Sequence, residues 1–140
     1  EDGAALADAV IATIPAWVVR CVTHRAPHLH DEAAAAGARA VADVGPRLHE
    51  LLSADIDEQR VNPLMLVRAA VRYPTQVLTD AGIEPPHRSS FDVEHFPDDP
   101  YDLVPMTWRD VDESLHELGI VWGARKAMAH RARHGGGSTS

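Results

Sequence analysis

The chain has 140 residues, of which 45% are hydrophobic, and it carries a formal net charge of −8 at pH 7. This size suits one compact domain, and the apolar content is too high for a disordered chain. The acidic balance argues against nucleic acid as a partner, because proteins that bind nucleic acid neutralise its phosphates with a basic surface.

An apolar stripe predicts the first helix, from about residue 3 to residue 24. Apolar residues recur there at every third or fourth position: Leu6, Val10, Ile14, Trp17 and Cys21. Pro15 removes one backbone hydrogen bond from this helix, so we expect a kink or a break there. No stretch of the chain reaches 18 uncharged apolar residues, so we expect no membrane span, and residues 9–19 lack the basic leader of a secretory signal.

The turn that follows, THRAPHLHDE (residues 23–32), is rich in histidine. A zinc ion needs three or four nitrogen, sulfur or oxygen ligands, and the turn offers them in its polar side chains: His24, His28, His30 and Asp31. Pro27 disfavours the helical conformation at the residue before it, so His24 and His28 should not share a helix face. We therefore favour a polar connection between two helices, with Asp31 as the cap of the second. A metal-binding or metal-sensing site in the cluster His24–Glu32 is the alternative.

Two further helical segments follow this turn. The run DEAAAAGARAVADV has strong helix propensity and begins a helix that Gly45-Pro46 should kink or interrupt. Asn62-Pro63 is a typical helix start, and Tyr73-Pro74 should break or bend the helix that follows. We expect Gly82 to end it in the left-handed conformation, with Ile83 in contact with Leu78.

Residues 84–106 differ in kind, because they hold five of the ten prolines and few periodic apolar positions. We expect an extended segment without regular structure. Its apolar side chains are too numerous for a free linker: Phe91, Val93, Phe96, Tyr101, Leu103 and Val104. The segment should therefore lie across the helices and bury some of these side chains. Long irregular segments of this kind are often functional.

The last helix should begin at a capping box formed by Thr107 and Asp110 and run to about Arg133. Residues 92–117 contain nine acids and one base, whereas residues 118–140 contain four bases and no acid. The helix dipole favours this order of charges, and the basic end could also bind an acidic partner or a second copy. Gly119, Gly123 and Ala127 fall four apart and would allow another helix to approach closely, inside the fold or across a dimer.

The runs RYPTQVLTDAGIEPP, FPDDPYDLVP and GIVWGARKA are similar to those of small helical proteins from high-GC actinobacteria. This resemblance implies a cytoplasmic bacterial protein and supplies no activity or functional residues. The basic side chains are 12 arginines and one lysine, which agrees with a GC-rich source.

The sequence therefore predicts an all-α fold of four main helices, some kinked at proline, with a long acidic, Pro-rich segment before the last helix. Residues 1–134 should form one helical domain, and residues 135–140 a flexible tail. Cys21 is the only cysteine, which excludes an internal disulfide, and its register with Trp17 and Ile14 indicates a core residue rather than a nucleophile. The chain lacks a phosphate-binding glycine loop, a nucleophile elbow and an HExxH motif.

These absences favour a protein without enzymatic activity and without a cofactor, although a helical bundle can enclose a small-molecule pocket that no linear motif announces. We expect a non-enzymatic interaction or adaptor protein with a protein partner, and self-association is a second interpretation. The expected binding surface consists of aromatic and acidic residues in and beside the Pro-rich segment: Phe96, Asp98, Asp99, Tyr101 and Trp108.

Overall fold

The structure is a computed structural model that describes residues 3–53, 62–105 and 107–139. These residues form helices and loops and contain no strand, which confirms the all-α prediction. The elements, in chain order, are α1 (Gly3–Thr23), η1 (Pro27–Leu29), α2 (His30–Ser53), α3 (Pro63–Ala69), α4 (Arg72–Asp80), α5 (Ser90–His95), α6 (Trp108–Val111), η3 (Glu113–Leu115) and α7 (His116–Thr139).

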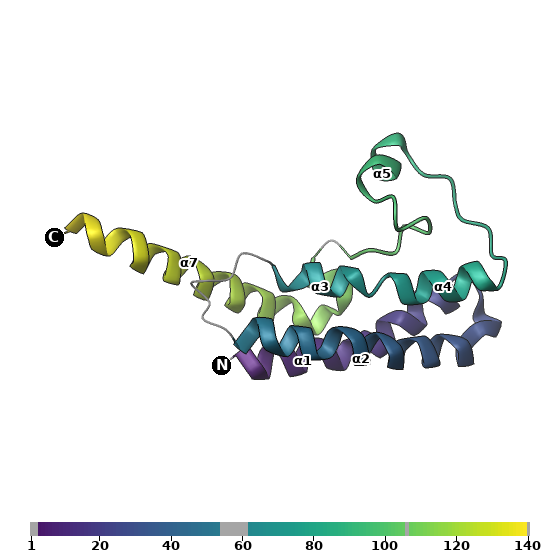
Figure 1. Ribbon diagram of the computed structural model, residues 1–140, viewed down its shortest axis with the longest axis horizontal. Coiled ribbons are helices and arrows are strands. Elements are labelled where there is room, and N and C mark those ends of the chain that lie inside the picture. The colour runs from purple at the N-terminus through teal and green to yellow at the C-terminus, as the bar shows by residue number, and fades with distance from the viewer. Residues whose placement is uncertain (1–2, 54–61, 106, 140) are drawn as a thin grey trace.

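The two long helices α1 and α2 pack against each other along their length (Figure 1). Pro15 and Pro46 both lie inside continuous helices, so neither proline breaks its helix as the sequence had allowed. Gly37 of α2 lies against Pro15, where an added Cβ would be 3.1 Å from the Pro15 Cα. A glycine at this position thus lets the two backbones approach where α1 has lost a hydrogen bond.

By its length and composition alone, α1 could cross a membrane. The expectation that the chain has no membrane span stays a prediction. The charged residues of α1, Asp8 and Arg20, lie toward the two ends of the helix. They limit the uncharged apolar run to residues 9–19, which is shorter than the 18 residues that the sequence criterion required. In the structure, Val10, Ile14 and Val18 are fully buried in the core, as they would be in the central helix of a folded domain.

Helices α3 and α4 form a further layer on α1 and α2 (Figure 1). The predicted start is confirmed, because the Asn62 side chain accepts a hydrogen bond from Leu64 N at 3.0 Å, with proline next in the chain. The break expected at Tyr73-Pro74 lies earlier, between Ala69 and Arg72, and Tyr73 and Pro74 fall in the first turn of α4. The predicted end is confirmed as well. Gly82 has φ +75, and the Ile83 amide donates to the Leu78 carbonyl at 3.0 Å.

The capping box of Thr107 and Asp110 is present, but it caps the four-residue helix α6 and not the last helix. The extended backbone of Asp112 ends α6, and the Asp112 carboxylate then accepts a hydrogen bond from Ser114 N at 2.8 Å to start η3. Helix α7 begins only at His116 and continues to Thr139, past the predicted end near Arg133. Low helix propensity of the three consecutive glycines explains why the sequence predicts an earlier end. Of the expected tail, Ser140 lies outside the described residues.

Helix α7 joins the packed helices only through its first turns. Leu115 just before it and Trp122 within it are buried, and Leu118 is half-buried. Beyond these residues, α7 extends past the ends of α1 and α2 (Figure 1). The four main helical segments expected from the sequence are therefore present, but α7 does not lie along the others as a full member of a bundle.

A hydrogen bond between α2 and α4 depends on pH. Tyr73 Oη donates to Asp43 Oδ2 at 2.7 Å, and Arg47 Nη2 lies 3.1 Å from the other carboxylate oxygen. The Tyr73 hydrogen bond, followed by the charge of Arg47, lowers the pKa of the Asp43 carboxyl below its ordinary value. The same hydrogen bond raises the pKa of the Tyr73 phenol. Both pKa shifts have the same cause: the hydrogen bond favours a charged Asp43 carboxylate beside a neutral Tyr73 phenol.

We expect Tyr73→Phe to destabilise the protein at neutral pH and to lose this effect in acid. Because the folded-state pKa of Asp43 is lowered, its contribution is present above the ordinary aspartate value of 3.8 and is lost as the pH falls below it. Urea unfolding of both proteins across the acid and neutral range measures the difference. A difference that stays constant down to the most acid pH would contradict this role for Asp43.

Candidate protein-binding cleft

The histidine-rich turn connects two helices, and its predicted metal ligands do not converge. His24 follows α1, His28 lies in η1 and His30 begins α2, and all three are exposed. The one close pair is His30 Nδ1 and Asp31 Oδ1, at 3.8 Å, with both side chains open to solvent. Among the residues that the structure describes, no three histidine, cysteine, aspartate or glutamate side chains are grouped to hold one ion. The alternative metal site is therefore not supported, since Pro27 redirects the chain between the histidines. Asp31 lies in the first turn of α2 and not at its cap.

The Pro-rich segment divides into two parts that behave differently. Residues 84–98, here named the arch, rise away from the helices and carry α5 (Figure 1). Residues 99–105, here named the strap, return to the helices and bury Asp99, Tyr101 and Pro105. The expectation that the segment lies across the helices thus holds for the strap. It is wrong for Phe91 and Val93, which are exposed on the arch.

A short helix orders the arch. The Ser89 side chain caps α5 by accepting a hydrogen bond from Asp92 N at 3.2 Å. Arg88 Nη1 donates to the Phe96 carbonyl at 2.9 Å and closes the loop behind the helix. The sequence predicted extended backbone here because prolines lie on both sides of this six-residue helix and the helix is too short to show an apolar periodicity.

Two residues of the expected binding surface are buried structural residues. Asp99 is only 3% exposed, and its two oxygens accept hydrogen bonds from Leu103 N at 2.9 Å and Val104 N at 2.6 Å. Tyr101 is 2% exposed, and its hydroxyl donates to the Ile83 carbonyl. Neither side chain is accessible to a partner, so both are corrected to residues that hold the strap in place.

Trp108 belongs to a different contact. Its half-buried indole lies over Gly119, and its ring centroid is 6.5 Å from that of Trp122. It thereby fixes α6 to the start of α7. Of the expected surface, Phe96 and Asp98 line the cleft described below, and the buried Asp99 lies in its wall.

Arginine side chains hold the strap and α6 on the helices. Arg25 Nη2 donates to the Tyr101 carbonyl at 2.8 Å, and Arg68 Nε donates to the Pro105 carbonyl at 3.0 Å. Arg20 Nη2 donates to the Val111 carbonyl at 2.8 Å. Irregular backbone leaves carbonyl groups without partners in a helix or sheet, and the fork of donors on arginine suits such positions. Sequence reasoning missed these contacts, because no local pattern shows which carbonyl an arginine will reach.

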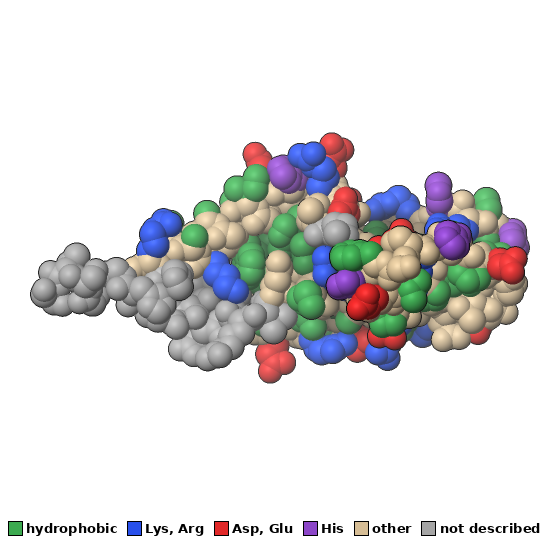
Figure 2. Space-filling view, turned by 90° about the horizontal axis from the view of Figure 1, so that it is seen from above, with side chains coloured by type: hydrophobic (Ala, Val, Ile, Leu, Met, Phe, Trp, Pro, Cys, Tyr) green, Lys and Arg blue, Asp and Glu red, His purple; other side chains and the backbone are tan. Residues whose placement is uncertain are grey.

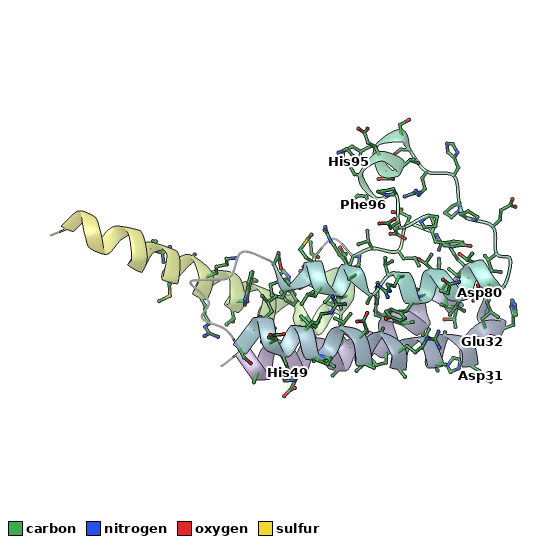
Figure 3. The ribbon with its side chains drawn as sticks, in the orientation of Figure 1. Asp31, Glu32, His49, Asp80, His95 and Phe96 are labelled. Carbon is green, nitrogen blue, oxygen red and sulfur yellow. The ribbon has the colours of Figure 1, made fainter. Side chains whose placement is uncertain are left out.

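A cleft of about 680 Å³ lies between the helices α3 and α4 and residues 95–104. Apolar side chains from both sides line it: Met65, Val71, Phe96 and Val104. Charged side chains of both signs also face it, namely Arg68 and Arg72 from the helices and Asp98 from the arch. Figure 3 shows His95 and Phe96 on the arch above α3 and α4, far from Asp31 and Glu32 at one end of α2.

The part of the arch beside the cleft is ordered by contacts of its own. The His95 ring stacks on Phe91, with ring centroids 3.9 Å apart. The Phe91 side chain itself is exposed and does not line the cleft, whereas Phe96 is half-buried and does. The view from the side of the arch shows apolar side chains interspersed with acids, bases and histidines (Figure 2).

The cleft offers apolar and charged groups for binding, and Cys21 lies outside it. Burial raises the pKa of the Cys21 thiol to about 12, so it is not ionised near neutral pH. The Asp99 carboxylate accepts hydrogen bonds from two backbone amides. An apolar cleft with charges at its edge is an arrangement suited to recognition.

No protein-family model, curated protein sequence or solved structure matches this chain.

Proposed function

We propose that this protein is a non-enzymatic interaction module that binds a segment of a partner polypeptide in the cleft between α3–α4 and residues 95–104. The observation that supports the proposal most directly is the cleft itself. It is an open hollow of about 680 Å³ with apolar walls and with Arg72 and Asp98 on different sides.

The open shape favours a polypeptide over a small molecule. Small-molecule sites bury most of the surface of their ligand, whereas this cleft is open to solvent. A side chain projecting from a partner can enter such a hollow while the rest of the partner stays outside it. Aromatic and arginine residues dominate the energetics of protein interfaces, and the cleft contains Phe96, Arg68 and Arg72.

The charges define the chemistry of the partner segment. Arg72 lines the cleft and is exposed, and its guanidinium carbon lies 5.3 Å from the centre of the Tyr73 ring. Arg68 is already bonded to the Pro105 carbonyl. We therefore propose a segment with one large apolar side chain close to an acidic residue, which would pair with Arg72.

A cytoplasmic location in a bacterium is proposed together with this function. The resemblance to small actinobacterial proteins supports it, and the burial of the apolar residues of α1 within the core agrees with a folded, water-exposed domain.

The proposal is tested with two phenylalanines on the same arch. Peptides from a random display library are selected on the immobilised full chain, and their affinities are then measured for the wild type, Phe96→Ala and Phe91→Ala. We expect the selected peptides to share an apolar residue near an acid. Phe96→Ala should weaken their binding at least about tenfold, because truncation of an interface anchor commonly costs that much. Phe91→Ala, which removes only the ring stacked on His95, should weaken it much less than Phe96→Ala does.

Equal affinity of the selected peptides for wild type and Phe96→Ala would remove the cleft as the binding site, and so would failure to select any peptide. In a second arm, peptides are selected on Arg72→Glu. We expect these peptides to lack the acidic residue. If they retain it, Arg72 does not read the partner's charge.

A further inference from the structure

Helix α7 has two apolar faces, and the packed helices cover only one of them. The covered face carries Leu118 and Trp122. The exposed apolar residues of α7 fall at spacings that place them together on the opposite side of the helix: Ile120, Val121, Ala124, Ala127 and Met128. We name this second set the α7 stripe.

The large members of the α7 stripe are well exposed. Ile120 is 57% exposed, Val121 49% and Met128 61%. Exposed single apolar residues are ordinary, but a continuous apolar face along more than two turns of a helix marks an interaction surface. Glu117 lies one turn before the stripe and Arg131 one turn after it, on the same side of the helix, and both are exposed.

We propose that the α7 stripe binds the α7 stripe of a second copy of this chain, as an antiparallel helix pair with its two-fold axis at Ala124. In this register Ile120 faces Met128 of the second copy, and Val121 faces Ala127. The same register places Glu117 opposite Arg131, and the symmetry forms that pair twice. The opposite charges at the two ends of the stripe thus identify the partner as the same helix running in the opposite direction.

The sizes of the side chains and the shape of the molecule agree with this pairing. Alanine at the centre permits close approach of the two helices, while the larger Ile120 and Met128 fill the space on either side. Because the stripe and the Trp122 face lie on opposite sides of α7, the two sets of packed helices do not collide. Helix α7 also extends clear of α1 and α2 over its second half (Figure 1).

The pairing is expected to be weak. One helix from each copy buries less than the roughly 800 Å² per partner of a standard interface. Arg125 also borders the stripe next to the two-fold axis, so the Arg125 side chains of the two copies would repel each other. We therefore expect a dissociation constant on the order of micromolar or weaker.

Sedimentation of the full chain over a range of concentrations tests the proposal, with two charge-reversal variants. In E117R both ends of the stripe are basic, and in R131E both are acidic. Each variant alone should dimerise about tenfold less than the wild type, because two attractive pairs become two repulsive ones. An equimolar mixture should form heterodimers, since every pair is then complementary. Because the substituted side chains are exposed, circular dichroism should show unchanged folding.

A chain that remains monomeric at every concentration would overturn the proposal, as would a dimer that neither variant weakens. If α7 instead binds vesicles of anionic lipid, R131E should reduce that binding and E117R should increase it, and the mixture should show no heterodimer. This outcome also overturns the proposal. The cleft contains no residue of α7, so these results are independent of the test of the proposed function.

Discussion

Tyr101→Ala is expected to lower the free energy of unfolding by about 3–5 kcal/mol, the usual cost of truncating a buried aromatic side chain to alanine. Tyr101 is 2% exposed, it donates a hydrogen bond to the Ile83 carbonyl, and its own carbonyl accepts one from Arg25. The substitution leaves a cavity under the strap and an unpaired carbonyl at the end of α4. The strap could also detach while the helices stay folded. In that case the decrease in the free energy of unfolding cannot exceed the free energy that attaches the strap to the helices.

Two measurements separate these cases. Urea unfolding followed by circular dichroism gives the global loss, and limited proteolysis reports detachment of the strap, residues 99–105. The control is Tyr101→Phe, which keeps the ring and removes only the hydroxyl. It should cost about 1 kcal/mol and leave the strap resistant to protease. A Tyr101→Ala protein with the stability and protease resistance of the wild type would show that the strap is not held by this residue.

Gly119→Ala is expected to destabilise the protein by about 1–3 kcal/mol, as overpacking of a close contact does. A Cβ added at Gly119 would lie 2.0 Å from Trp108 Cδ1, so the indole would have to leave its place. Displacing it would also separate Trp108 from Trp122, and tryptophan fluorescence should change with the loss of stability.

Gly123, one turn later on the same helix, provides the matched control. A Cβ added there meets nothing within 4 Å, and the residue is exposed. Gly123→Ala should therefore stabilise the protein by up to about 1 kcal/mol, because alanine favours the helix. Thermal unfolding of both variants should give shifts of opposite sign. Stabilisation by Gly119→Ala as well would contradict the packing of Trp108 on this glycine.

The local signals in the sequence were the most reliable ones. Asn62-Pro63, Gly82 and the capping box of Thr107 and Asp110 each act within a few residues, and all three are present in the structure. Even so, the capping box began a single turn instead of the long helix expected after it. A capping box predicts where a helix starts but not how long it is. Helix α6 ends at Asp112, whose backbone is extended, and the capping box contains no information on that residue.

The contacts that shape the candidate site are long-range, and this is why the sequence did not reveal them. Arg25 reaches Tyr101, and Arg68 reaches Pro105, across the fold. Asp99 and Tyr101 looked like surface residues because they lie in an acidic, Pro-rich segment and because aromatic residues dominate the energetics of interfaces. The structure uses one to satisfy the amides of a turn and the other to fill the core.

Gly119, Gly123 and Ala127 illustrate the same limit. Their spacing predicted one surface for close helix approach, and the structure divides it. Gly119 is buried under Trp108, while Gly123 and Ala127 are exposed. Apolar residues recur at helical spacing on both faces of α7. The sequence alone therefore does not show which face is buried and which is exposed.

The central claim is that the strap is fixed to the helices and thereby holds residues 95–104 in place as one wall of the cleft. Amide hydrogen exchange of the intact chain tests this most directly. The informative amides are those of Leu103 and Val104, which donate hydrogen bonds to the buried Asp99 carboxylate. We predict that these two amides exchange slowly, while those of Glu84, His87 and Arg88 in the arch exchange rapidly. Equally rapid exchange in both stretches would show a loose strap, and the cleft would then lack its second wall.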